Sequence, residues 1–168
     1  MATRRTVGVG HTAPDFTLPD QNGQSVRLKD LLKQGPVVLY FYPRDHTPGC
    51  TLEACAFRDA HSQFKDAGAT VVGVSDDSIS VHQSFASQHS LPFTLLSDQT
   101  GTVRELYGVP RPLGIIPGRV TYVIEQNGIV RHVFTSHLRM QKHVTEALKT
   151  ISELASSRNA ETSRRSVS

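Results

Sequence analysis

The stretch that decides the fold is Val37–Cys55, with the sequence VVLYFYPRDHTPGCTLEAC, which contains both cysteines of the chain. Its first six residues are apolar and rich in β-branched and aromatic side chains, which predicts a buried strand over 37–42. Pro43 ends this strand, and Pro48-Gly49 is typical of a turn. Beyond Cys50, apolar residues recur at roughly helical spacing. Cys50 is therefore expected where a strand passes into a helix.

A cysteine at that place is expected to be reactive. The first turn of a helix has backbone N–H groups without partners and carries the positive end of the helix dipole. Both features favour an anion, so Cys50 should be held as a thiolate, which is the nucleophilic form of cysteine. The hypothesis is that Cys50 is a reactive thiolate and that the rest of the chain holds it in place.

The remaining chain alternates between predicted strands and helices. The expected elements, in order, are a β-hairpin over 15–28, a helical turn over 29–34, the strand over 37–42, a helix from 51 to 67, a strand over 70–75, a helix over 79–89, a strand over 93–96, a helical turn ending at 106, a loop over 108–118, a hairpin over 119–134 and an amphipathic helix over 140–154. Such alternation predicts an α/β fold, with a partly parallel sheet extended by antiparallel strands.

One domain is expected over residues 1–155. The 168-residue chain is long enough for a hydrophobic core of its own. Residues 156–168 are rich in serine, arginine and threonine and nearly free of apolar residues, so they are predicted to form a disordered tail.

Composition excludes several classes of function. The formal net charge is +3, and no basic stripe interleaved with aromatic residues is present, so nucleic-acid binding is not expected. No apolar run approaches the roughly 20 residues of a membrane span. The first residues lack the apolar core of a secretory signal, and two cysteines in such a chain suggest a reducing compartment. The expected location is the cytoplasm, or a plastid if a transit peptide has been removed.

The residues around Cys50 resemble a known family. Pro43, Thr47 and Cys50 have the spacing of the peroxiredoxin active site, and FYPRDHTPGCTLEACAFRD over 41–59 is similar to the peroxiredoxin Q subfamily, also called bacterioferritin comigratory protein. The stretches APDFTL over 13–18 and PGRVTYVI over 117–124 agree, the latter being most like cyanobacterial and plastid members. The resemblance covers about residues 7–154. It implies a thioredoxin-like fold, with a central mixed sheet flanked by helices and an N-terminal β-hairpin.

The resemblance also implies roles for five residues. Cys50 would be the peroxidatic cysteine, which attacks the peroxide O–O bond and becomes a sulfenic acid. Cys55 would be the resolving cysteine, which forms an intramolecular disulfide that thioredoxin or a similar dithiol protein reduces. Thr47 would place its hydroxyl against the thiolate and the peroxide, Pro43 would screen the sulfur from water, and Arg119 would stabilise the thiolate and the leaving oxygen. No cofactor or metal is implied, and a monomer is favoured.

Helix geometry adds a prediction about the disulfide. Residues five apart in a regular helix have Cα atoms roughly 8–9 Å apart. A disulfide usually requires Cα atoms within about 6.8 Å. If residues 50–55 are all helical, Cys50 and Cys55 cannot bond unless the first turns of the helix unwind.

Several alternatives remain open from the residues themselves. Cys55 could be inert core packing, and Arg119 could be a surface arginine on a strand. Arg44 or Arg58, which lie closer in sequence, could then supply the positive charge near Cys50. Glu53 is read as a carboxylate that favours the helix start, without a catalytic role. His82 and His89, on a predicted helix, are expected to be solvated.

Two other functions compete with a peroxidase. A dithiol–disulfide oxidoreductase or thiol redox sensor could use the same fold, although oxidoreductases of the thioredoxin type separate their cysteines by two residues rather than four. A metal-binding or cysteine-based binding module could use Cys50, Cys55, His46 and His61. Zinc sites favour a gap of two to four residues between paired cysteines together with a second ligand pair downstream, and no such downstream pair appears.

Overall fold

The structure, a computed structural model, describes residues 6–109 and 118–166 of the chain. Its centre is a mixed five-stranded sheet with the strand order β5-β4-β3-β6-β7. The strands are β3 (Val37–Phe41), β4 (Thr70–Ser75), β5 (Thr94–Ser97), β6 (Val120–Ile124) and β7 (Val130–Thr135). β3, β4 and β5 are parallel, whereas β6 pairs antiparallel with both β3 and β7. This confirms the predicted α/β fold.

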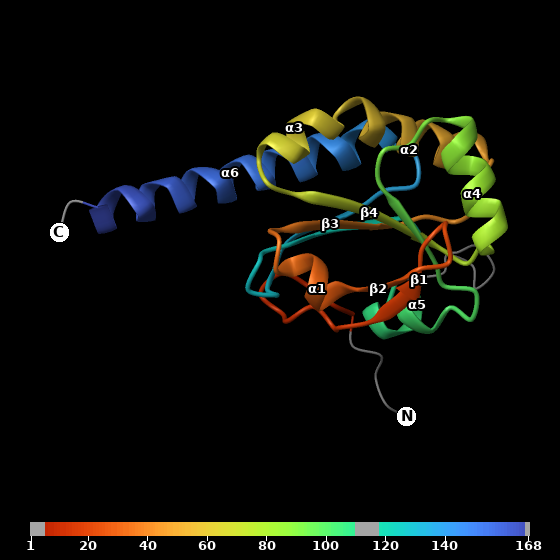
Figure 1. Cartoon of the computed structure of the whole chain (residues 1–168), viewed down its shortest axis with the longest axis horizontal. Helices are drawn as coiled ribbons and strands as arrows, with labels where there is room; N and C mark the ends of the chain where they lie inside the picture. Colours follow the sequence, from red (N-terminus) through yellow and green to blue (C-terminus); the bar gives the residue numbers. More distant parts are fainter. Residues whose placement is uncertain (1–5, 110–117, 167–168) are drawn as a thin grey trace.

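β3 lies in the middle of the sheet, and all five of its residues are buried. Its side chains alternate between the two faces of the sheet, as the period of a strand requires. One face is covered by α2 (Pro48–Asp59), α3 (His61–Asp66), α4 (Ile79–Gln88) and α6 (Met140–Ser166) (Figure 1). The other is covered by α1 (Leu28–Leu32), α5 (Thr102–Tyr107) and the hairpin of β1 (Thr17–Pro19) and β2 (Ser25–Arg27). The predicted N-terminal hairpin is thus confirmed.

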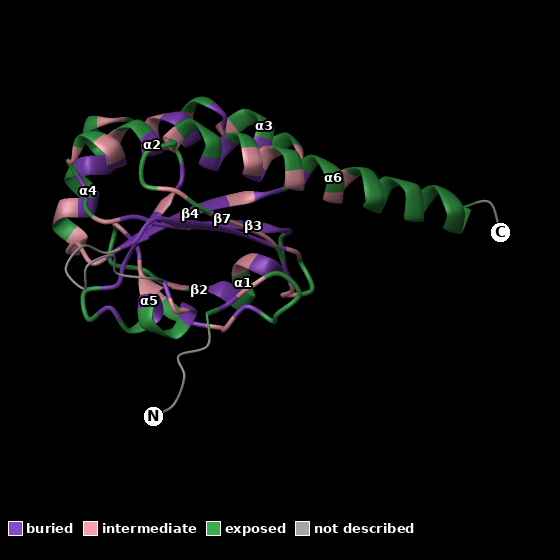
Figure 2. Ribbon diagram, turned by 180° about the vertical axis from the view of Figure 1, so that it is seen from behind, coloured by how far each residue is buried: buried purple, intermediate pink, exposed green. Residues whose placement is uncertain are grey.

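The two faces form separate hydrophobic cores, visible as the buried layers on either side of the sheet (Figure 2). On the helix-rich face, the Tyr40 ring of β3 stacks on Phe57 of α2, with ring centroids 4.5 Å apart. Phe57 also packs against Phe64 of α3. Burying aromatic rings of this size fixes α2 firmly on the sheet, and α2 carries both cysteines.

The predicted helix over 51–67 is interrupted. Its backbone leaves helical values at Ala60, where φ is −95° and ψ is 2°, so two helices, α2 and α3, take its place. Residues 110–117, most of the predicted loop over 108–118, lie outside the described residues. Among the helices of the described segments, none is long and apolar enough to cross a membrane.

Helix α6 is longer than the sequence analysis predicted. A helix ending at residue 154 and a disordered tail were expected, but the helix continues to Ser166 and projects away from the domain (Figure 1). Alanine, glutamate and arginine residues in 155–165 favour a helix once α6 has started. The residues of α6 from Ser156 to Ser166 are exposed, as Figure 2 shows, so this extension adds nothing to the core. The domain boundary at residue 155 stays a prediction.

Deleting residues 156–168 should therefore change the free energy of unfolding by no more than about 0.5 kcal/mol. The contacts that it removes include a hydrogen bond of 3.2 Å from Arg158 Nη2 to the carbonyl of Ala67. Ile151→Ala is the matched control, because Ile151 is buried on the same helix and its truncation should cost about 2–5 kcal/mol. Urea unfolding measures both variants, and a loss above about 2 kcal/mol from the deletion would contradict this assignment.

Candidate active site

Cys50 lies in the first turn of α2, as the sequence predicted. Thr47 has extended backbone angles and acts as the N-cap residue, and Pro48 follows as the first helical residue. Proline is favoured there because its missing N–H would have no partner in the helix. The N–H of Thr51 donates to the carbonyl of Thr47 at 2.9 Å, which closes the first turn. The Cys50 side chain is almost fully buried at this helix start.

Arg119 reaches Cys50 from the sheet. Its Nη2 donates to Cys50 Sγ at 3.3 Å, while its Nη1 donates to Glu53 Oε1 at 2.7 Å. Arg119 is buried, so the interpretation as a surface arginine is wrong. One guanidinium thus links two groups of α2 that can each carry a negative charge.

The sheet register and a glycine explain why Arg119 can reach the sulfur. Val120 pairs with Phe41, so Arg119 lies beside the end of β3. The loop over residues 42–47, which leads from β3 to the helix of Cys50 and is called the cysteine loop below, begins at this point. A Cβ on Gly49 would lie 3.2 Å from Arg119 Nη2 and 3.0 Å from Met140 Cε. A side chain at position 49 would therefore push against the guanidinium, and glycine leaves room for its approach.

Glu53 is the site residue that the sequence analysis missed. It is fully buried three residues after Cys50, so both side chains lie on one face of α2. Burial raises the pKa of Glu53 to about 7, although Arg119 acts in the opposite direction. Burial by itself lowers the pKa of Arg119. Glu53 and Cys50 raise it by more, so the pKa of Arg119 lies above its usual value. The helical spacing from Cys50 could have identified Glu53, but its burial could not be read from the sequence.

Thr47 and Pro43 line the same loop at half-buried positions. The Thr47 hydroxyl donates to the carbonyl of Arg44 at 2.8 Å. The structure thus brings Arg119 to Cys50 by a direct contact and places Thr47 at the start of the helix. The catalytic roles of Thr47 and Pro43 stay predictions.

His82 is not solvated, contrary to the sequence analysis. It is fully buried, and its Nδ1 lies 2.5 Å from Asp45 Oδ2, while its Nε2 donates to the carbonyl of Leu96 at 3.0 Å. Asp45 also accepts a hydrogen bond of 2.5 Å from the Tyr42 hydroxyl. The reason for the error is that Asp45, two residues before the N-cap Thr47 of α2, provides a partner from a loop distant in sequence.

Asp45 and His82 lie close to Asp77, and the three residues could together offer ligand atoms to a metal. Asp77 Oδ2, however, accepts the N–H of Asp45 at 2.8 Å and the hydroxyl of Ser75 at 2.6 Å. The atoms of Asp45, Asp77 and His82 that could bind a metal already form hydrogen bonds, which hold the cysteine loop to β4 and α4. We therefore assign these residues no metal. Cys50, Cys55, His46 and His61 do not form a metal-binding group in the described part of the chain.

Arg104 of α5 is a second residue that sequence reasoning missed. It is buried, and its guanidinium donates to the carbonyls of Tyr42 at 2.8 Å and Gly118 at 2.9 Å. These are the residues directly before Pro43 and Arg119. Arg104 therefore fixes the backbone of the cysteine loop relative to the backbone that presents Arg119.

Cys55 lies half-buried on α2, five residues beyond Cys50, and both cysteines are free thiols. Because α2 is helical from Pro48 to Asp59, the two cysteines are held in the arrangement that prevents a disulfide. Resolution of a sulfenic acid by Cys55 thus requires a different conformation of α2.

Residues 9–133 match the model of the AhpC/TSA family. The chain is 52% identical over 146 residues to the chloroplastic peroxiredoxin Q of Sedum lineare, which covers 86% of this chain and 78% of that protein. The chain belongs to the peroxiredoxin Q subfamily of peroxiredoxins. This peroxiredoxin is thus a thiol-dependent peroxidase, as the residues around Cys50 predicted.

Solved structures agree with this assignment. The peroxidoxin BcpB of Mycobacterium tuberculosis superposes with a TM-score of 0.83 at 43% identity, over 88% of this chain and 97% of that one. A bacterioferritin comigratory protein of Xanthomonas campestris, described for its alkyl peroxide reduction activity, gives a TM-score of 0.76 at 27% identity, over 83% of this chain and 92% of that one. The thioredoxin-like fold expected from the sequence is confirmed.

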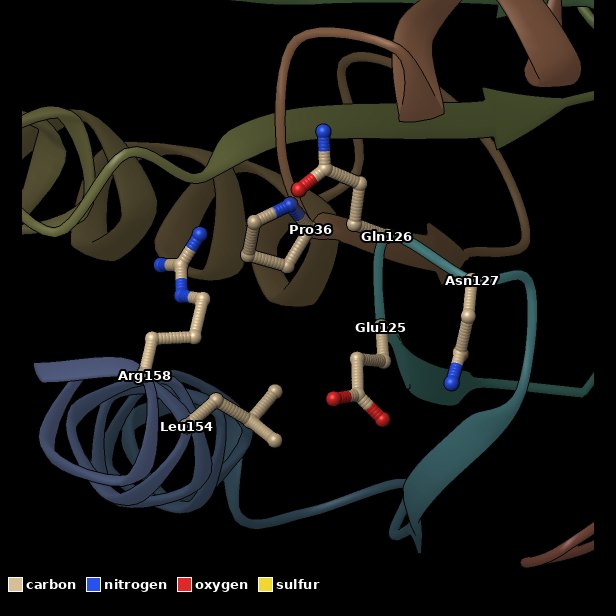
Figure 3. A pocket seen from close by; sticks show the side chains of 6 residues that line it. All are labelled: Pro36, Glu125, Gln126, Asn127, Leu154 and Arg158. Carbon is tan, nitrogen blue, oxygen red and sulfur yellow. The ribbon is translucent and has the colours of Figure 1, made fainter. Parts of the chain in front are cut away.

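A surface hollow of about 340 Å³ lies at the opposite end of the sheet from Cys50 (Figure 3). It is lined by Pro36, Glu125, Gln126, Asn127, Leu154 and Arg158. Pro36 directly precedes β3 and Glu125 directly follows β6, whereas Cys50 follows the other end of β3. We assign this hollow no part in the chemistry of the cysteines.

The position of Arg104 yields a prediction. Arg104→Met should leave the buried carbonyls of Tyr42 and Gly118 without these donors and cost about 2–5 kcal/mol of folding free energy. It should also slow the reaction of Cys50 with peroxide, because Arg119 is then less well placed. Arg58→Met is the control, since Arg58 likewise donates to a carbonyl, that of His89, but away from the cysteine loop. Equal effects of the two substitutions on the peroxide reaction in a stopped-flow measurement would contradict the assignment.

Proposed function

We propose that Cys50 is the peroxidatic cysteine of this peroxiredoxin and that Cys55 resolves its sulfenic acid. The observation that carries the proposal is the contact of 3.3 Å between Arg119 and Cys50 Sγ at the start of α2. A guanidinium and a helix N-terminus both stabilise a thiolate at the sulfur. The second cysteine on the same helix then provides the thiol for resolution.

The first step transfers one oxygen atom. The Cys50 thiolate attacks the terminal oxygen of the hydroperoxide, an S–O bond forms and the O–O bond breaks. Cys50 is oxidised to the sulfenic acid, and the peroxide is reduced to an alkoxide or hydroxide that takes up a proton. Arg119 lies where it can stabilise the negative charge on the leaving oxygen. The Thr47 hydroxyl would orient the peroxide, and Pro43 would limit the access of water to the sulfur.

The second step forms a disulfide. The Cys55 thiol attacks the Cys50 sulfenic acid, and one water molecule leaves. A dithiol protein such as thioredoxin reduces the disulfide and restores both thiols. We propose both hydrogen peroxide and organic hydroperoxides as substrates, a choice supported by the alkyl peroxide activity described for the Xanthomonas campestris relative.

Location and assembly are also proposals. The Sedum lineare relative is named as chloroplastic, which supports a plastid or plastid-like setting for this chain. The alternative is the cytoplasm. A monomer is the proposed assembly state.

Mass spectrometry after one equivalent of hydrogen peroxide tests the division of roles. The wild-type chain should lose two hydrogens and contain a Cys50–Cys55 disulfide within one molecule. Cys55→Ser should instead retain sulfenic or sulfinic acid on Cys50, and Cys50→Ser should neither react nor consume peroxide. A disulfide between two chains would contradict the intramolecular scheme.

The conformational requirement is tested by amide hydrogen exchange. Since α2 holds the two cysteines apart, exchange across residues 50–57 should be much faster in the disulfide form than in the reduced form. Residues of α4, which carries neither cysteine, are the internal reference and should exchange equally in both forms. Equal protection of 50–57 in both forms would show that the disulfide needs no unwinding.

A further inference from the structure

Glu53 has one carboxyl oxygen without a partner. Oε1 receives the hydrogen bond from Arg119, but Oε2 is buried and has no hydrogen-bond partner. A buried, ionised oxygen without a donor is costly, whereas a protonated one carries no charge. The arrangement around Oε2 therefore decides which form of Glu53 the fold favours.

The polar atom facing Oε2 is a nitrogen of His143. His143 is fully buried on α6, which lies beside α2 on the same face of the sheet (Figure 1), and its Nδ1 lies 3.6 Å from Glu53 Oε2. Its Nε2 lies 2.8 Å from the carbonyl of Ser136. A carbonyl only accepts, so Nε2 bears the hydrogen, and a neutral ring then has its lone pair on Nδ1.

Thr121 completes this arrangement. Its hydroxyl lies 2.7 Å from His143 Nδ1, so it donates to that lone pair. Burial lowers the pKa of His143 to about 4, which keeps the ring neutral. The lone pair of Nδ1 is thus taken by Thr121, and Glu53 Oε2 receives no donor from the ring. A buried carboxyl oxygen that receives no donor favours a hydrogen on Oε2 itself.

The charges around Cys50 point the same way. In the described part of the chain, Arg119, His143 and Tyr40 lie around Glu53, and Cys50 shares the Arg119 guanidinium with it. Burial raises the pKa of Tyr40 far above its usual value, so that hydroxyl is neutral. Arg119 is thus the one cation among these four, and it faces two groups that can be anions. With Cys50 as a thiolate, a second buried anion at Glu53 would be uncompensated.

We propose that Glu53 is a carboxylic acid, protonated at Oε2, while Cys50 is a thiolate, and that it releases this proton when Cys50 is oxidised. The inference rests on the proposed role of Cys50. The thiolate, the hydroperoxide and the protonated Glu53 give the sulfenic acid, the alcohol or water, and the Glu53 carboxylate. Charge is conserved, because the anion moves from sulfur to carboxylate. Glu53 acts through Arg119 and does not touch the peroxide, so it is a positioning residue that keeps the charge at Arg119 constant.

Infrared difference spectroscopy tests this proposal in the full chain, with Cys55→Ser to retain the sulfenic acid. Spectra before and after one equivalent of hydrogen peroxide, at a pH slightly below the Glu53 pKa of about 7, should show loss of the C=O stretch of a protonated carboxyl. Carboxyl-labelled ¹³C-glutamate should shift the band, and Glu53→Gln should abolish it. The isotope shift needs no substitution at Glu53, so it keeps the test decisive if Glu53→Gln fails to fold.

Two further variants address the part of His143. His143→Leu should keep the band, because the lone pair of Nδ1 is taken by Thr121 and the ring forms no hydrogen bond with Oε2. Glu146→Gln should leave the band unchanged, since Glu146 of α6 pairs with His132 of β7 at 3.0 Å and not with Glu53. ¹⁵N NMR of the reduced protein should show His143 with a single N–H.

The outcomes distinguish an error in the proton assignment of Glu53 from an error in the proposed role of Cys50. Absence of the band, a band that ¹³C-glutamate does not shift, or a doubly protonated His143 would overturn the proton assignment, if the same sample consumes peroxide normally. Failure of the sample to consume peroxide would instead overturn the proposed role of Cys50.

Discussion

The double hydrogen bond of Arg119 to Cys50 and Glu53 is the interaction on which the rest of the site depends. It joins the sheet to the first turn of α2 through one buried cation. The pairing of β6 with β3 places Arg119 beside the end of β3, and the absence of a side chain at Gly49 lets the guanidinium approach. Neither the helix start nor the arginine alone makes this environment, so the reactivity of the sulfur is a property of the tertiary fold.

The proposed reaction requires two different conformations of α2, a helical one for the reaction with peroxide and an unwound one for the disulfide. Its helical form holds Cys50 against Arg119, where the guanidinium stabilises a thiolate, the form that we propose reacts with peroxide. Cys55 lies on that helix at a distance that excludes a disulfide. The fold therefore stabilises the form that reacts with peroxide and must lose that stabilisation before resolution. Under the proposed proton release, oxidation moves the negative charge from Cys50 to Glu53, so Arg119 keeps an anionic partner on α2 after the thiolate is gone.

Local sequence patterns were sufficient for much of this structure. The apolar run over 37–42, the proline that ends it and the turn dipeptide before Cys50 predict the strand–helix junction from neighbouring residues alone. The site was only partly predictable. Arg119 came from the family resemblance, and Glu53, His82 and Arg104 were missed or misread because their burial and partners arise from segments distant in sequence. The long end of α6 was missed because apolar periodicity stops at Leu154, whereas helix propensity continues.

The central claim is that one guanidinium contacts the Cys50 thiolate and the Glu53 carboxyl group at once, and the rate constant of Cys50 with hydrogen peroxide in Arg119 variants tests it most directly. Lysine keeps the charge but lacks the planar fork that spans two partners. Arg119→Lys and Arg119→Met should therefore both lower the rate constant, by roughly 10²–10³-fold for methionine, with lysine restoring only part of the loss. A rate constant for Arg119→Lys equal to that of the wild-type protein would contradict the need for the double contact, and an unchanged rate for Arg119→Met would contradict the account as a whole.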